Sequence, residues 1–127
     1  MPLQRDILLV DDDDDIRDAL SETLLDEGFS VHPVPNGREA LAWLHEHPDT
    51  PCVVLLDLMM PVMDGWTFLR YRSADPALAK IPVVVITAEY GFAQLTKDHQ
   101  VNEFVTKPIM LPRLLAAING ACGLPRN

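Results

Sequence analysis

Three aspartates, a threonine and a lysine stand just after the ends of short apolar runs: Asp11, Asp12, Asp57, Thr87 and Lys107. Two unit charges about 4 Å apart repel by roughly 4 kcal/mol at an effective dielectric near 20, so three clustered carboxylates require a counter-ion. Oxygen ligands without nearby cysteine or histidine favour Mg²⁺ or Mn²⁺ over zinc. A cation beside a hydroxyl and an ammonium group is suited to phosphoryl transfer, in which an aspartate can itself accept the phosphoryl group.

These side chains meet only if the apolar runs before them are neighbouring strands of one sheet. The runs are continuous and rich in β-branched residues, which is typical of strands covered on both faces. They comprise residues 7–10, 52–56, 83–86 and a weaker 104–106. Residues 29–34 predict a further strand, which Pro33 places at a sheet edge because proline cannot donate to a ladder.

Helical patterns alternate with these strands. Ile16, Leu20 and Leu24 recur at helical spacing before Gly28, a residue typical of a helix C-terminus. Further helices are predicted after Asn36-Gly37, over about 65–72, and from Pro112, whereas residues 90–102 give a fourth helix little support. This alternation predicts a three-layer, doubly wound α/β domain, in which ligands bind beyond the carboxyl ends of the parallel strands.

Composition and charge narrow the classes of function. The chain has 127 residues, which fits one domain, and 10 Lys and Arg against 19 Asp and Glu give a formal net charge of −9. This charge disfavours direct binding to nucleic acid or to anionic membranes. The sequence shows neither a signal peptide nor an apolar run long enough to span a bilayer, so we expect a cytoplasmic protein.

Two cysteines, Cys52 and Cys122, lie in apolar surroundings. In a reducing cytosol we expect two buried thiols that pack as small apolar side chains, in preference to a disulfide.

Four motifs in order carry a resemblance to a known family. They are ILLVDD at 7–12, VVLLDLMMPVMDG at 53–65, VVVITAE at 83–89 and VTKP at 105–108. Together they resemble the receiver domain of bacterial two-component response regulators over nearly the whole chain. The resemblance implies a single receiver domain over residues 1–127 with no effector domain. It also implies a flavodoxin-like fold with five parallel strands in the order 2-1-3-4-5.

The resemblance also assigns a role to each residue of the metal and phosphoryl site. Asp57 corresponds to the phosphoacceptor. Asp12 and Asp57 correspond to carboxylates that bind Mg²⁺ directly, Asp11 to one that acts largely through water, and Met59 to the donor of a backbone carbonyl to the metal.

Three further positions correspond to the switch of the family. Thr87 matches the hydroxyl that moves to the phosphoryl group, Lys107 the lysine that pairs with it, and Phe104 the aromatic residue that moves inward. The Lys107-Pro108 peptide is expected to be cis. The resemblance implies a histidine kinase or a histidine phosphotransfer protein as donor and a downstream protein as target. It leaves open whether two copies form a homodimer.

Two alternatives to this signalling switch remain at the level of sequence. A haloacid-dehalogenase-type phosphatase also uses an aspartate at a strand end and Mg²⁺, but it requires a second aspartate two positions later, where this chain has Met59. A degenerate receiver would act only as a docking module without phosphorylation. The segment before Phe104 lacks the small residues usual in the family, which keeps this alternative open. In the main interpretation the chain is not an enzyme beyond phosphorylating and dephosphorylating itself.

Overall fold

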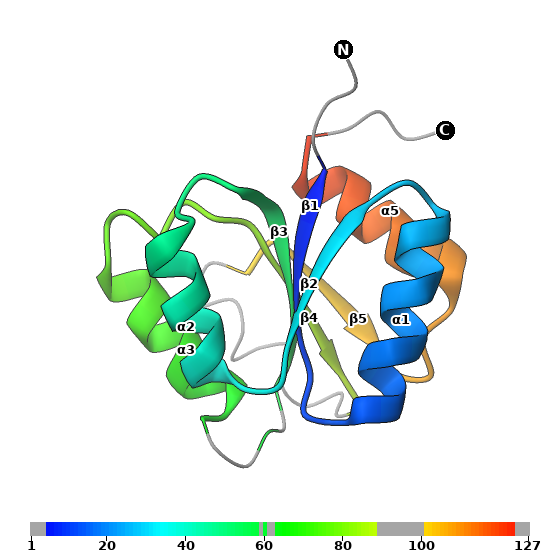
Figure 1. Ribbon diagram of the computed structural model, residues 1–127, viewed down its shortest axis with the longest axis horizontal. Coiled ribbons are helices and arrows are strands. Elements are labelled where there is room, and N and C mark those ends of the chain that lie inside the picture. Colours follow the sequence, from blue (N-terminus) through cyan, green and yellow to red (C-terminus); the bar gives the residue numbers. More distant parts are fainter. Residues whose placement is uncertain (1–4, 59, 61–62, 89–100, 124–127) are drawn as a thin grey trace.

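A five-stranded parallel sheet forms the centre of the molecule (Figure 1). The computed structural model describes residues 5–58, 60, 63–88 and 101–123. The strands lie in the order β2-β1-β3-β4-β5, which confirms the predicted order. Their bounds are β1 Asp6–Val10, β2 Ser30–Val34, β3 Pro51–Asp57, β4 Val83–Thr87 and β5 Glu103–Thr106.

Helices cover both faces of this sheet, as the alternating pattern predicts. Helices α1 (Asp14–Asp26) and α5 (Leu111–Ala121) lie on one face, and α2 (Gly37–Glu46) and α3 (Gly65–Ala74) on the other (Figure 1). Most of the segment expected to hold the fourth helix lies outside the described residues. No helix of the described part is both long and apolar enough to cross a bilayer.

Each face of the sheet has its own apolar core, because successive side chains of a strand point to opposite faces. On the side of α2 and α3, Leu8, Leu56 and Phe68 are fully buried in one cluster. On the side of α1 and α5, Leu55 and Ile118 are fully buried in the other. The central strands β1 and β4 are buried at every position, which explains their continuous apolar sequences.

Capping residues in the sequence determine where α1 begins and ends. Asp13 caps α1, because its side chain accepts hydrogen bonds from the backbone N–H groups of Asp15 and Ile16. Gly28 ends the same helix with a φ of +94°, a conformation that glycine adopts without strain. Pro33 lies in the edge strand β2, as predicted.

The prediction of two unpaired thiols was wrong. Cys52, in β3, and Cys122, directly after α5, form a disulfide with their Cα atoms 5.1 Å apart. Both residues are half-buried, and both pack against the core cluster between the sheet and α1 and α5. The two cysteines are 70 positions apart in the sequence. Their proximity could not be predicted from local patterns, because it arises only when α5 packs along the sheet.

Candidate functional site

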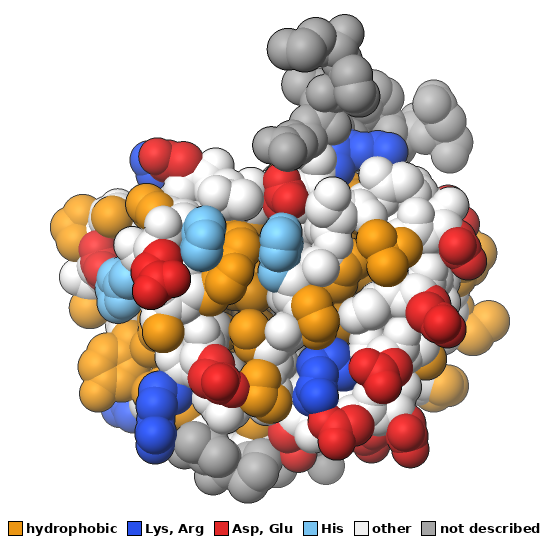
Figure 2. All heavy atoms as spheres, in the orientation of Figure 1, with side chains coloured by type: hydrophobic (Ala, Val, Ile, Leu, Met, Phe, Trp, Pro, Cys, Tyr) orange, Lys and Arg blue, Asp and Glu red, His pale blue; other side chains and the backbone are white. Residues whose placement is uncertain are grey.

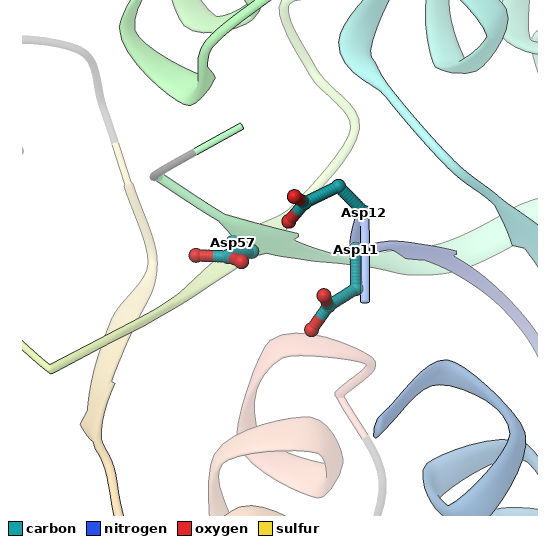
Figure 3. Close-up of side chains that lie close together, drawn as sticks. All are labelled: Asp11, Asp12 and Asp57. Atoms are coloured by element: carbon teal, nitrogen blue, oxygen red, sulfur yellow. The ribbon is translucent and has the colours of Figure 1, made fainter. Parts of the chain in front are cut away.

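Three aspartates converge where β1 and β3 end. The two strands are parallel neighbours with Val10 opposite Leu56, so Asp11 and Asp57 stand at the same edge of the sheet. Carboxylate oxygens of Asp11, Asp12 and Asp57 all lie within 4.8 Å of one another (Figure 3). Asp11 and Asp57 are only 3% and 6% exposed, whereas Asp12 is exposed. The site is therefore an acidic cluster with two buried carboxylates and one exposed to solvent.

Thr87, at the end of β4, and Lys107, directly after β5, come to the same edge. The Lys107 ammonium Nζ lies 3.8 Å from Oδ2 of Asp57, and the lysine side chain is 27% exposed. The Lys107 backbone N–H donates to the carbonyl oxygen of Thr87 at 2.9 Å. Thr87 is the last residue of β4 and is fully buried. The fold thus gathers the five residues that the sequence placed after apolar runs.

The remaining predicted site residues lie beside this edge or outside the described part. Phe104 is half-buried and packs against the core cluster on the side of α2 and α3. The Lys107-Pro108 peptide is cis, as expected. Met59 lies outside the described residues, so its predicted contribution stays a prediction.

Burial makes the charge of Asp11 unfavourable. Desolvation is the largest cause and raises the pKa of Asp11 above its ordinary value of 3.8, and the charges of Asp12 and Asp13 act in the same direction. The Asp13 backbone N–H, which donates to Asp11 Oδ1 at 2.9 Å, and the charge of Lys107 oppose this rise without cancelling it. In the protein without a bound cation, ionised Asp11 is therefore destabilising.

This raised pKa predicts that Asp11→Asn stabilises the protein when no divalent cation is bound. Asparagine can still accept the Asp13 N–H but carries no charge, so we expect a melting temperature a few degrees higher in EDTA at pH 7. Wild-type Asp11 is neutral below its ordinary pKa of 3.8, so the difference should fade as the pH approaches that value. Thermal unfolding at a series of pH values measures both effects. An unchanged or lower melting temperature at pH 7 would contradict the electrostatic explanation.

Arg17 is a contributor to the site that sequence reasoning missed. Its Nη1 donates to the backbone carbonyl oxygen of Asp11 at 2.8 Å, and its Nη2 pairs with the Asp14 carboxylate. The arginine side chain is only 16% exposed. It therefore fixes the backbone from which Asp11 and Asp12 project. The only signal in the sequence is a cation within the first turns of the helix that follows the aspartates.

Gly65 lies directly against Leu58, the residue that follows Asp57. Its backbone N–H donates to the Leu58 carbonyl oxygen at 2.9 Å, and a Cβ on Gly65 would lie 2.7 Å from the Leu58 Cα. Asp64 caps α3 by accepting the Thr67 N–H at 2.8 Å, and the helix begins at Gly65, where the sequence predicts its start. Only glycine allows α3 to start this close to the end of β3.

The donor set fits a hard divalent cation. Mg²⁺ is bound in proteins by one or more carboxylates together with water and substrate oxygens, and three carboxylates within 4.8 Å can supply such ligands. The pKa of Asp11 is raised mainly by desolvation, and the charge of Lys107 does not cancel this rise, so a bound cation would stabilise the ionised Asp11. The exposed position of Asp12 leaves a cation open to solvent and to a phosphate group.

Comparison with known proteins agrees with this fold. Residues 7–119 match the model of the response regulator receiver domain. An uncharacterised 14.6 kDa protein of Leptolyngbya boryana is 34% identical over 94% of this chain and 91% of its own length. The response regulator MprA of Mycolicibacterium vanbaalenii is 37% identical over 91% of this chain but 48% of its own length.

Solved structures give the same result. The chemotaxis response regulator CheY4 of Vibrio cholerae superimposes with a TM-score of 0.84 at 29% identity, over 94% of this chain and 99% of that one. For the response regulator PleD of Caulobacter vibrioides, the match covers 81% of this chain and only 23% of the relative. The match spans nearly the whole chain of the CheY4 structure but only part of the larger regulators MprA and PleD, and this chain belongs to the response regulator receiver domain family.

Proposed function

We propose that this chain is a phosphorelay switch in which Asp57 accepts a phosphoryl group with the help of Mg²⁺. The observation that carries the proposal is the position of Asp57. Its carboxylate stands beside both Asp11 and Asp12, and Lys107 lies 3.8 Å from it on another strand. A bound Mg²⁺, held by the three carboxylates and the Met59 carbonyl, would offset the charge of the phosphoryl oxygens during transfer.

The proposed reaction moves one phosphoryl group between two partners. An Asp57 carboxylate oxygen attacks the phosphorus of a phosphohistidine or a small acyl phosphate, and the bond from phosphorus to the donor breaks. The donor leaves with the electron pair of that bond, and Asp57 becomes an acyl phosphate. Lys107 is placed to pair with an oxygen of the transferred group, because its ammonium already faces Asp57. Water later hydrolyses the acyl phosphate and restores the carboxylate.

Phosphorylation then changes the surface of the protein. The phosphoryl group brings a charge of about −1.5 to −2 and strong acceptor oxygens to this edge of the sheet. Thr87, buried at the end of β4, is proposed to donate its hydroxyl to one of them, and its movement would admit the half-buried Phe104 ring. A local electrostatic change thereby biases a surface between two states, which a downstream protein distinguishes.

The donor is proposed to be a histidine kinase or a histidine phosphotransfer protein. Such a donor must bring its phosphohistidine to Asp57 and so must cover the edge beside Lys107. A hollow of about 300 Å³ lies there, and apolar side chains of α1 and of the loop before α5 line it together with Lys107. Acidic side chains gather over α1 (Figure 2), which disfavours nucleic acid as the partner on this face.

Incubation of the protein with acetyl phosphate and Mg²⁺, followed by intact-mass analysis, tests the proposal. We expect one phosphoryl group per chain, sensitive to hydroxylamine as acyl phosphates are, and none when EDTA replaces Mg²⁺. Steady hydrolysis of phosphate monoesters would instead support the phosphatase. A folded protein that acquires no adduct at any Mg²⁺ concentration would support a docking module and overturn the switch.

Arg17 is expected to act as a positioning residue for the metal site. Arg17→Gln should raise the dissociation constant for Mg²⁺ about tenfold, because hydrogen bonds that hold metal-binding residues in place typically contribute that much. Asp14→Asn is the matched control, since it removes the surface ion pair of Arg17 but keeps the bond to the Asp11 carbonyl. Isothermal titration with MgCl₂ measures both variants, and Arg17→Lys, which keeps the charge, should restore part of the affinity. If surface charge alone mattered, loss of the Arg17 charge would leave the dissociation constant of Arg17→Gln unchanged or lower it, and this result would contradict the positioning role.

A further inference from the structure

We propose that Cys52 and Cys122 form a reversible redox pair that attaches the C-terminal end of α5 to the start of β3. The two residues are already joined as a disulfide, with Cα atoms 5.1 Å apart. Cys52 is the second residue of β3, and Cys122 follows the last residue of α5. Both are half-buried, so a small reductant or oxidant needs only a local opening to reach the sulfurs.

The fold does not depend on this bond, and this makes two folded redox states available. On the side where α5 lies, Val53, Leu114 and Ile118 are fully buried and fix the helix on the sheet. A domain of this size buries enough surface to fold without a disulfide. Reduction therefore removes one covalent link and leaves the packing in place.

Oxidation determines whether α5 is held at one end or at both. Near its N-terminal end, Arg113 donates to the Phe104 carbonyl oxygen at 2.9 Å and to the Glu103 carboxylate at 2.8 Å, which attaches the helix to β5. The disulfide attaches the other end. In the reduced protein the last turn of α5 keeps its apolar contacts and its own backbone hydrogen bonds but has lost its covalent link to β3, so it should open more often.

The redox pair lies far from the phosphoacceptor. Cys52 and Asp57 stand near opposite ends of β3, five residues apart, which corresponds to roughly 16 Å in a strand. The redox state is therefore expected to change the mobility of α5 and the stability of the protein without changing the chemistry at Asp57. The consequence for signalling rests on the proposed function, because α5 lies beside β5 and Phe104, where that switch acts.

The chemistry is thiol–disulfide exchange with a small disulfide such as oxidised glutathione. One cysteine thiolate attacks a sulfur of glutathione disulfide, a mixed disulfide forms, and one glutathione leaves as a thiolate. The second cysteine thiolate then attacks the protein sulfur of the mixed disulfide, and the second glutathione leaves. Two cysteines are oxidised, one glutathione disulfide is reduced to two glutathiones, and the protons of the protein thiols pass to the leaving thiolates.

Equilibration of the protein in buffers of defined glutathione ratio, followed by thiol alkylation and mass analysis, tests the proposal. We expect full conversion between a form with no free thiol and a form with two, and both forms should unfold cooperatively. Because the disulfide closes a loop of about 70 residues, the oxidised form should melt roughly 10 °C higher. The Cys52→Ala/Cys122→Ala double variant should show no response to the glutathione ratio. Two free thiols at every ratio, or equal melting temperatures of the two forms, would overturn the proposal.

Two further measurements separate this inference from the proposed function. Hydrogen exchange should show greater protection of residues 117–122 in the oxidised form, and little change at the end of β3. Acetyl phosphate should label both forms at the same initial rate. Absence of label in both forms would overturn the switch and leave the redox pair intact, whereas equal exchange at 117–122 would overturn the redox effect on α5.

Discussion

Asp57→Asn is expected to abolish the phosphoryl adduct completely while the chain remains folded. Asparagine has nearly the same shape as aspartate, but its amide is not a nucleophile for phosphorus under these conditions. The substitution also removes one of three clustered negative charges, so the variant should be at least as stable as the wild type in EDTA. Intact-mass analysis with acetyl phosphate and Mg²⁺ measures the adduct, and thermal unfolding checks the fold.

Asp12→Asn is the matched control within the same cluster. It removes a metal ligand and leaves Asp57 in place, so label should still appear but should require more Mg²⁺. The environment of each carboxylate supports this division of roles. The Asp11 carboxylate accepts the Asp13 N–H, Asp12 is exposed, and only Asp57 has the Lys107 ammonium 3.8 Å away. A full phosphoryl adduct on the Asp57→Asn variant would show that another residue is the phosphoacceptor.

The parts of this site that the sequence predicts are those set by the ends of strands. Continuous apolar runs identify the central strands, and parallel strands end at one edge, so Asp11, Asp57 and Lys107 could be expected to meet. The order of the strands cannot be predicted in this way, because apolar runs alone do not indicate which strands are neighbours. That order came from the resemblance to receiver domains, and the structure confirms it.

Arg17 and the disulfide could not be predicted, for two physical reasons. Arg17 donates to the backbone carbonyl of Asp11. Every residue has a backbone carbonyl, so such a contact leaves no recognisable spacing pattern in the sequence. Cys52 and Cys122 are 70 positions apart, and their apolar neighbours are equally consistent with paired and with unpaired sulfurs. Both features depend on how α1 and α5 lie on the sheet, which local patterns do not determine.

The second large effect is expected at Gly65, where the close approach of α3 to β3 leaves no room for a side chain. In Gly65→Ala, the new Cβ would lie 2.7 Å from the Leu58 Cα and 2.8 Å from its Cδ2. The first of these atoms belongs to the backbone, so a change of rotamer cannot relieve the overlap. We expect a loss of about 2–3 kcal/mol in the free energy of unfolding, as for other overpacked sites. This corresponds to a melting temperature roughly 10 °C lower.

The same substitution should also weaken the metal site, because the displaced residue, Leu58, directly follows Asp57. Isothermal titration should then give a higher dissociation constant for Mg²⁺ than in the wild type. Gly120→Ala is the matched control: Gly120 is exposed in α5, and alanine there should leave both the stability and the affinity for Mg²⁺ at least as high. If Gly65→Ala lowered the melting temperature but kept the wild-type affinity for Mg²⁺, the contact between Gly65 and Leu58 would support the fold without positioning Asp57. An unchanged melting temperature would contradict the close contact itself.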